Sequence, residues 1–174
     1  MIQKTSSKKY NALIDAKVLT ISKFSSIIDT VEVKVALNNN PYYNQNYTRE
    51  QIDAVLNTIK QCVEANRYTI SLGTNRQENQ DLIDEYNIRE EKQKEILMNI
   101  SVDDFCHTLR NTKLGFEHEI LYVFVPQVEL YNTLDEKETV DIYTKFNVLE
   151  LPKGKKAIVI SFHKLNRPID YAFR

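Results

Sequence analysis

The 174-residue sequence predicts an α+β domain in which helices come first and an antiparallel sheet comes last. Three features lead to this prediction. A capped amphipathic helix begins at Thr48, an apolar run spans Ile120–Val125 before Pro126, and an alternating segment over Val140–Val148 is followed by a turn and a second alternating segment, Ala157–His163.

The helical half is defined by capping signals and apolar spacing. Thr48-Arg49-Glu50-Gln51 has the pattern of a capping box, in which the Thr hydroxyl and the Gln amide each satisfy a free backbone N–H. The apolar residues that follow recur at helical spacing: Ile52, Val55, Leu56, Ile59 and Val63. Further helices are predicted over Asp81–Tyr86 and Ser101–Phe105, and a short strand at Tyr68–Ile70. Asn87 and Glu90 repeat the capping pattern, so another helix is predicted to begin at Asn87.

The strand half alternates with a period of two, which assigns side chains to faces. One face of the first segment carries Val140, Ile142, Phe146 and Val148, and the other carries Asp141, Tyr143, Lys145 and Asn147. Lys153-Gly154-Lys155 predicts a hairpin turn. In the returning segment, Ile158, Ile160 and Phe162 are expected on one face and Val159, Ser161 and His163 on the other.

Residues 1–47 are predicted to be an N-terminal arm and linker, and residues 48–174 the main domain. Thr30–Val35 alternates and predicts a strand, Val18–Ile21 is a second candidate strand, and Asn38–Asn46 is polar and turn-forming. Because an isolated strand is unstable in water, the arm is expected to pair with an edge of its own domain's sheet. The alternative is pairing with a second molecule, which would give a homodimer, or with a protein partner.

Composition excludes several classes of protein. The glycines Gly73, Gly115 and Gly154 stand alone, so nucleotide-binding glycine loops are excluded. No apolar run is long enough to span a membrane, no export signal is evident, and Cys62 and Cys106 are expected to be free thiols, which together predict a cytoplasmic protein. The Cys106-His107 pair with His118 lacks the fourth ligand of a closed zinc site, so no metal is expected.

The net charge of −1 conceals an uneven distribution. Residues 1–49 carry seven basic residues against three acids, residues 50–152 carry ten against twenty, and residues 153–174 carry six against one. A basic C-terminal segment of this kind suits an anionic partner such as nucleic acid, although the charges also fit two ordinary solvated surfaces.

Tyr143, Lys145 and His163 are the candidate functional residues of the strand half. Cleaving RNA without a metal requires a base for the 2′-hydroxyl, a cation for the phosphate charge and an acid for the leaving oxygen, and these residue types supply all three. Tyr143 and Lys145 share a strand face. The alternative is structural: the lysine stem covers the tyrosine ring, and His163 is an ordinary polar residue at a strand end.

The segment from Thr48 to Arg174 resembles the motility quorum-sensing regulator toxin family. The order of features matches: the capped helix, NIREEKQKEILMNISVDDF, LYVFVP, VDIYTKF and VISFHKLNRPIDYAFR. The most specific parts are Ile142-Tyr143-Thr144-Lys145 and Ile160-Ser161-Phe162-His163, which look like the family's Tyr-x-Lys strand and its final Ser-Phe-basic strand. Residues 1–47 have no counterpart.

The resemblance implies a RelE-like fold with an RNA site on the open face of the sheet. It also implies a sequence-preferring mRNA endonuclease that acts as the toxin of a toxin–antitoxin pair, needs no cofactor and is neutralised by a cognate antitoxin. By this carry-over His163, Tyr143 and Lys145 are catalytic, and His107 falls where one branch has a lysine. The same branch of the family has a glutamine of the site in the central strand, and this chain has Val123 at that position. That part of the site is therefore absent here or supplied by Gln127.

Three basic residues near the C-terminus are expected to hold flanking phosphates: Lys164, Arg167 and Arg174. Two other functions remain open. The chain could be a RelE-like module that binds nucleic acid or protein without catalysis, which Val123 and the arm favour, or a structural partner whose arm adds a strand to another chain's sheet.

Overall fold

The capped helix and the apolar strands build an α+β fold, seen in a computed structural model that describes residues 43–174. The helices of this part are α2 (Arg49–Glu64), α3 (Gln77–Glu85) and α4 (Glu90–Asn99), with short 3₁₀ turns η1 (Thr74–Arg76) and η2 (Val102–Asp104). The strands are β1 (Tyr43–Asn44), β2 (Tyr68–Ile70), β3 (Phe105–Arg110), β4 (Ile120–Phe124), β5 (Gln127–Tyr131), β6 (Lys137–Leu151) and β7 (Gly154–Lys164).

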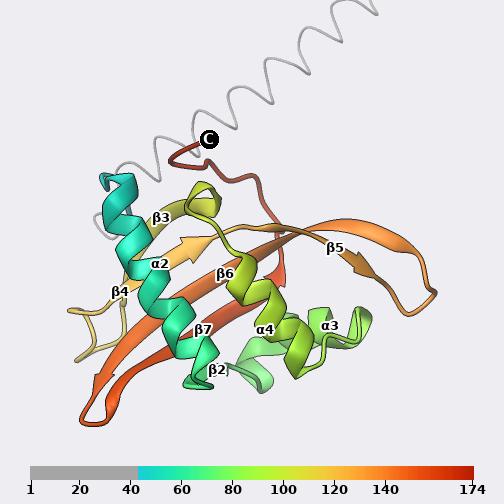
Figure 1. Ribbon diagram of the computed structural model, residues 1–174, viewed down its shortest axis with the longest axis horizontal. Coiled ribbons are helices and arrows are strands. Elements are labelled where there is room, and N and C mark those ends of the chain that lie inside the picture. The colour runs from blue at the N-terminus through green and yellow to red at the C-terminus, as the bar shows by residue number, and fades with distance from the viewer. Residues whose placement is uncertain (1–42) are drawn as a thin grey trace, which may run out of the picture. The chain divides into compact units, whose positions relative to one another are not determined.

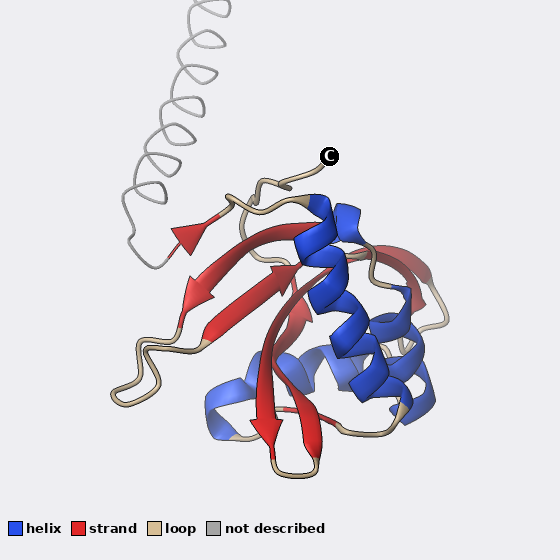
Figure 2. Cartoon of the chain, turned by 60° about the vertical axis from the view of Figure 1, so that its left-hand side comes forward, coloured by secondary structure: helices blue, strands red, loops and turns tan. Residues whose placement is uncertain are grey.

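The described strands form one seven-stranded sheet in the order β1-β3-β4-β6-β7-β2, with β5 paired to the first part of β6. All pairings are antiparallel except that of β2 with β7. The helices α2 and α4 lie across the same face of this sheet (Figures 1 and 2). The mixed α+β class is therefore as the sequence predicted.

Between these helices and the sheet lies the main hydrophobic core. Helix α2 contributes Ile52, Leu56, Ile59, Cys62 and Val63, which are almost completely buried. The sheet contributes the four fully buried phenylalanines Phe105, Phe124, Phe146 and Phe162. Burying an aromatic side chain stabilises a fold by about 1.5–3 kcal/mol, so this face holds much of the free energy of folding.

Local signals determine the start of α2. Thr48 caps the helix: Gln51 N–H donates to the Thr48 hydroxyl at 3.3 Å, and Thr48 N–H donates to the Gln51 side-chain oxygen at 2.9 Å. The predicted capping box is thereby confirmed. The second predicted cap is wrong, because α4 begins at Glu90 after Arg89, while Asn87 adopts a left-handed backbone with φ of 46°. Asn87 ends the turn after α3, a conformation that asparagine tolerates better than most residues.

Two other expectations need correction. The segment expected to be a helix through Phe105 is a single 3₁₀ turn capped by Ser101, and Phe105 opens strand β3, which the sequence did not predict. Strand β5 was also not predicted. The strands Val18–Ile21 and Thr30–Val35, and the pairing proposed for them, lie outside the described residues. Within residues 43–174 no helix is long and apolar enough to cross a membrane.

Candidate nucleic-acid site on the open sheet face

The sheet face opposite α2 and α4, called the open face below, carries the candidate residues of the β6–β7 hairpin. In the antiparallel register, Tyr143 lies opposite His163 and Lys145 opposite Ser161. The neighbouring Phe146 and Phe162 point into the helix-covered core, so their strand neighbours Lys145 and His163 point the other way. The structure thus brings Tyr143, Lys145 and His163 to one face.

A β-bulge in β7 decides which residues share that face. The partner of Lys145 is Ser161 and that of Phe146 is Val159, so Ile160 is the extra residue. As a result Ala157, Val159 and Phe162 are buried in the core, while Ile158 and Ile160 are only partly buried. The expectation that Ile158, Ile160 and Phe162 share one face is wrong, because an uninterrupted period of two does not pass through a bulge.

Asn79 of α3 fixes this bulge. Its side-chain nitrogen donates to the carbonyl oxygens of Ser71 at 2.7 Å and Ile160 at 3.2 Å, and its oxygen accepts from Phe162 N–H at 2.8 Å. Asn79 is almost completely buried, so these bonds satisfy backbone groups that water does not reach. Helix α3 therefore holds the end of β7 on which His163 lies.

The rings of Tyr143 and His163 stack with centroids 5.2 Å apart and planes inclined by 24°. The His163 side chain keeps 14% of its surface exposed. Its Nδ1 lies 2.9 Å from the Lys164 carbonyl oxygen and its Nε2 lies 3.5 Å from a carboxylate oxygen of Glu78. Both ring nitrogens therefore face acceptors, an arrangement that accommodates the protonated ring.

Burial, with a smaller effect of Cys106, raises the pKa of Tyr143 to about 12. At neutral pH the Tyr143 hydroxyl therefore keeps its proton and can donate a hydrogen bond. Burial also lowers the pKa of Lys145, and the positive charge of Arg76 lowers it further. Arg76 is exposed at the end of η1, the turn that precedes α3.

His107 joins the same face through a second bulge. The register of β3 against β4 shifts between Phe105 and His107, which makes Cys106 the extra residue. His107 then lies opposite Val123, and Val123 lies opposite Lys145. His107, Val123, Lys145 and Ser161 thus form one row across four strands, called the cross-strand row below.

The surroundings of His107 are mostly closed to water. The residue is 7% exposed, and the Tyr43 ring of β1 lies against its imidazole with centroids 4.4 Å apart. Among the described residues, its Nδ1 is a buried polar atom without a hydrogen-bond partner. Burial, and secondly the charge of Lys145, lowers the pKa of His107 to about 4. The ring is therefore neutral at pH 7.

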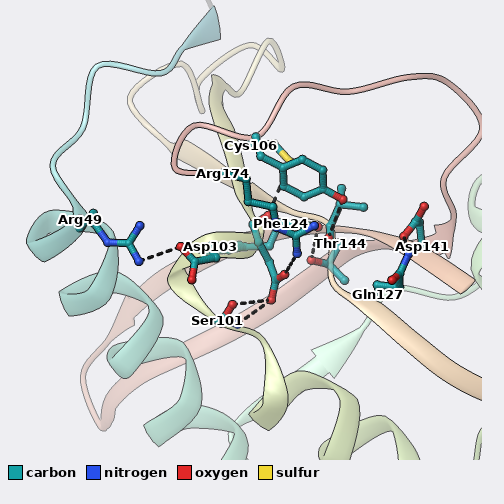
Figure 3. A network of polar contacts seen from close by, with 12 residues as sticks. Arg49, Ser101, Asp103, Cys106, Phe124, Gln127, Asp141, Thr144 and Arg174 are labelled. Carbon is teal, nitrogen blue, oxygen red and sulfur yellow. Dashed lines mark hydrogen bonds and ion pairs between the residues drawn. The ribbon is translucent and has the colours of Figure 1, made fainter. Parts of the chain in front are cut away.

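The three basic residues expected to hold flanking phosphates are placed differently from one another. Lys164 lies opposite Ile142 of the core, forms an ion pair with Glu85 at 2.7 Å and lies over the Tyr86 ring, so it does not join the open-face residues. Arg174 pairs with the carboxylate of the mostly buried Asp104 and lies over the Tyr171 ring at 4.0 Å (Figure 3). Arg167 is exposed in the segment that follows β7.

This C-terminal segment covers one end of the open face. Leu165, Ile169 and Tyr171 pack on a small cluster of Cys106, Val123 and Val125. The Tyr171 hydroxyl donates to the Val125 carbonyl oxygen at 3.1 Å, and Ala172 N–H donates to the Phe105 carbonyl oxygen at 2.9 Å. Gln127 was considered as a substitute for the missing glutamine. Its side-chain nitrogen donates to the Asp141 carboxylate at 3.0 Å, and Asp141 lies two residues before Tyr143 in β6 (Figure 3).

Four residues beside the site were not identified from the sequence: Tyr43, Arg76, Glu78 and Asn79. None lies in a recognisable motif. Tyr43, Glu78 and Asn79 contact residues of the site from other elements, and Arg76 acts on Lys145 through its charge. Within residues 43–174 no group of three or more His, Cys, Asp or Glu side chains is arranged to hold a metal ion. Comparisons of the chain with protein families, with curated proteins and with solved structures gave no match.

Proposed function

We propose that the chain is a metal-independent endoribonuclease with a RelE-like fold, acting on mRNA in the cytoplasm as the toxin of a toxin–antitoxin pair. The observation that supports this most is the stacked Tyr143–His163 pair on the open face, with Lys145 two residues from Tyr143 on the same strand. These three side chains supply a proton carrier, a neutral hydrogen-bond donor and a cation, the set that RNA cleavage without a metal requires.

In the proposed reaction the ribose 2′-oxygen attacks the neighbouring phosphorus and the bond from phosphorus to the 5′-oxygen breaks. His163 accepts the 2′-hydroxyl proton and returns it to the departing 5′-oxygen, so the ring is regenerated. The products are a 2′,3′-cyclic phosphate and a 5′-hydroxyl. During the reaction the carboxylate of Glu78, 3.5 Å from Nε2, stabilises the protonated ring.

Tyr143 and Lys145 act on the phosphate in this proposal. Because its pKa is raised to about 12, Tyr143 donates a hydrogen bond from its hydroxyl to a phosphate oxygen instead of accepting a proton. Lys145 places its ammonium against the negative charge that grows on the same phosphate. The partly exposed His163 ring, stacked on Tyr143, also offers a surface for a nucleotide base.

Cleavage of an RNA by the purified chain in excess EDTA tests the proposal. The rate is expected to fall about 100- to 10,000-fold in His163→Ala, the range that general acid–base groups contribute. His118→Ala is the matched control, because His118 is an exposed histidine outside the open face. If His163→Ala cleaves as fast as the parent, the proposed mechanism is wrong.

The biological part of the proposal needs cells. Induced expression is expected to arrest bacterial growth, and His163→Ala is expected to relieve the arrest. Mapping the 5′-ends of total RNA after induction would give the cleavage sequence. Co-expression of the neighbouring gene product, as the candidate antitoxin, should restore growth and yield a complex that purifies together.

The second candidate is a RelE-like module that binds nucleic acid or protein without cleaving it. The observation that favours it is Val123, which is fully buried at the centre of the cross-strand row. One branch of the toxin family that this chain resembles has a glutamine at that position. This candidate predicts RNA binding that survives His163→Ala together with no cleavage by the parent. The cleavage assay described above therefore separates the two.

A further inference from the structure

Three cations lie at the turn between β6 and β7. Lys153 is in the turn itself, Lys156 follows in β7, and Arg67 comes directly before β2, the strand beside β7. Arg67 and Lys153 are exposed, Lys156 is partly buried, and none of the three forms an ion pair with a residue that the structure describes. Lys155 differs, because it pairs with Glu150 at 3.2 Å. Like charges that lie close together repel one another, so such a group suits an anionic ligand.

Strand register places Lys156 on the open face. It lies opposite Leu149, and Leu149 shares a face with Tyr143 and Lys145 because even numbers of residues separate the three in β6. The neighbouring Ala157 is buried in the core, as the alternation requires. Leu149 follows Tyr143 by six positions, which corresponds to about 20 Å of strand.

Arg67 joins Lys156 on this face. Strand β2 is parallel to β7, and Tyr68 lies beside Ala157 with both side chains on the core side. The carbonyl oxygen of Arg67 accepts from Ala157 N–H at 3.1 Å, so Arg67 continues the pairing by one residue. Its side chain therefore faces away from the core, and the guanidinium lies 4.0 Å from the point that a β-carbon at Gly154 would occupy.

The tip of the β6–β7 hairpin is accessible. The last residue pair between β4 and β6 is Leu121 with Asn147, so beyond Asn147 the described strand that pairs with β6 is β7. The tip therefore extends past β4 (Figure 2). On the β4 side, the carboxylate of Glu119 accepts hydrogen bonds from Asn111 at 2.7 Å and from Asn147 at 2.8 Å. Strand β6 separates this acid from the cations on the β7 side.

We propose that Arg67, Lys153 and Lys156, called the tip cluster below, bind the phosphates of single-stranded RNA that flanks the cleaved linkage. Arg67 holds two oxygens of one phosphate with its planar guanidinium, and the lysines act on neighbouring phosphates as point charges. Because the tip cluster lies about 20 Å along β6 from Tyr143, an RNA must extend several nucleotides beyond the reacting phosphate to reach it. The substrate class that follows is an extended single strand rather than a dinucleotide.

The identification of the anion as RNA rests on the proposed function, whereas the binding of a long polyanion does not. Two observations favour RNA. The tip cluster and the Tyr143–His163 pair share the open face, so one strand laid along β6 contacts both. Lys164 and Arg174, which the sequence predicted for flanking phosphates, instead pair with acids, whereas the tip cluster has no such partners among the described residues.

The test is a fluorescence-anisotropy titration of the full chain with 2′-O-methyl RNA in EDTA. This RNA lacks the free 2′-hydroxyl that the proposed cleavage consumes, so binding is measured without cleavage. A tetranucleotide, which is too short to contact both the Tyr143–His163 pair and the tip cluster, is compared with an RNA of roughly 12 nucleotides.

The triple variant with Arg67→Gln, Lys153→Gln and Lys156→Gln is expected to bind the longer RNA about 10- to 100-fold more weakly at about 0.1 M salt. It is expected to bind the tetranucleotide as the parent does. For the longer RNA, the slope of log K against log salt concentration should be smaller by about 2, since each neutralised phosphate of a single strand contributes about 0.7.

The matched control is the triple variant with Arg89→Gln, Lys92→Gln and Lys94→Gln. It removes the same charge from one arginine and two lysines, but in the region of α4, on the other face of the sheet (Figure 1). It is expected to bind both RNAs as the parent does. A further variant that exchanges arginine and lysine within the tip cluster keeps the charge and is expected to bind the longer RNA nearly as the parent does. Melting temperatures check that each variant is folded.

Equal losses in the two glutamine variants would overturn the tip cluster, because total charge would then explain the binding. The same would follow if the tip-cluster variant bound the longer RNA as tightly as the parent. A polyglutamate peptide tests the other class of anionic partner. Loss of peptide binding in the tip-cluster variant, with RNA binding unchanged, would assign the tip to an acidic protein and overturn RNA as its ligand.

Failure of this inference and failure of the proposed function give different results. A chain that binds the longer RNA through the tip cluster but does not cleave unmodified RNA would leave the cluster standing and refute the nuclease. Cleavage that depends on His163, in a chain whose tip-cluster variant binds RNA as the parent does, would refute the tip cluster alone.

Discussion

The burial of His107 as a neutral ring makes the stability of the fold depend on pH. The pKa of a histidine in an unfolded chain is about 6.5, and burial lowers that of His107 to about 4. Between these pH values the unfolded chain binds more protons at this position than the folded chain does. Stability therefore falls as the pH falls from 6.5 to 4, and below pH 4 no further loss arises from this residue.

Each unit by which a pKa differs between the folded and unfolded chain corresponds to about 1.4 kcal/mol of folding free energy. The full loss of stability due to His107 is therefore about 3 kcal/mol. Most of this, about 2–3 kcal/mol, should be lost by pH 4.5. A loss of this size is a large part of the 5–15 kcal/mol by which domains are stable. His107 is 7% exposed, so solvent screening reduces the effect little.

Urea unfolding of the parent and of His107→Asn at pH 7 and pH 4.5 measures the effect. Protonation of carboxylates destabilises both proteins equally, so the difference between them isolates His107. The variant is expected to lose about 2–3 kcal/mol less than the parent over this interval. His118→Asn, at an exposed histidine, should lose as much as the parent. Equal losses in the parent and His107→Asn would refute the reasoning.

Three further predictions concern stability and reactivity. Thr48→Ala removes the α2 cap and should lower the free energy of unfolding by about 1 kcal/mol, as measured by urea unfolding. Thr58→Ala, at a partly buried position in the middle of α2 that caps nothing, should change it by less than about 0.5 kcal/mol. Asn79→Ala leaves the β7 bulge without its partners and should cost about 2–4 kcal/mol, with faster hydrogen exchange at Phe162 N–H; unchanged exchange there would contradict the role of Asn79. Burial raises the pKa of the Cys106 thiol to about 12, so iodoacetamide at pH 8 should modify it only after unfolding, as mass spectrometry of the alkylated peptides would show.

Signals within a few residues of one another were predicted correctly from the sequence. The Thr48 capping box needs only residues three apart. Burial in β6 alternates with a period of two from Val140 to Phe146, so Tyr143 and Lys145 could be assigned to the face opposite that of Phe146 without knowing any partner strand. The β6–β7 turn likewise depends on Gly154, whose φ of 108° disfavours a side chain.

The predicted faces of Ile158 and Ile160 were wrong because they assumed that β7 has no bulge. A bulge depends on the partner strand and on what satisfies the freed backbone groups. At β7 that partner is Asn79, 81 residues before Ile160, and no local pattern around Ile160 reveals it. The prediction of a helix over Ser101–Phe105 failed for a different reason, because a capping box also forms at a single 3₁₀ turn.

The sequence by itself determined the α+β class, the α2 helix and the two-residue spacing of Tyr143 and Lys145, because each depends on backbone geometry that repeats over a few residues. Only the tertiary structure decided that His163 stacks on Tyr143 and that His107 is buried against the Tyr43 ring. These contacts join residues 20 or more positions apart. Their geometry depends on strand register and on the packing of α3, which the periodicity of one segment does not encode.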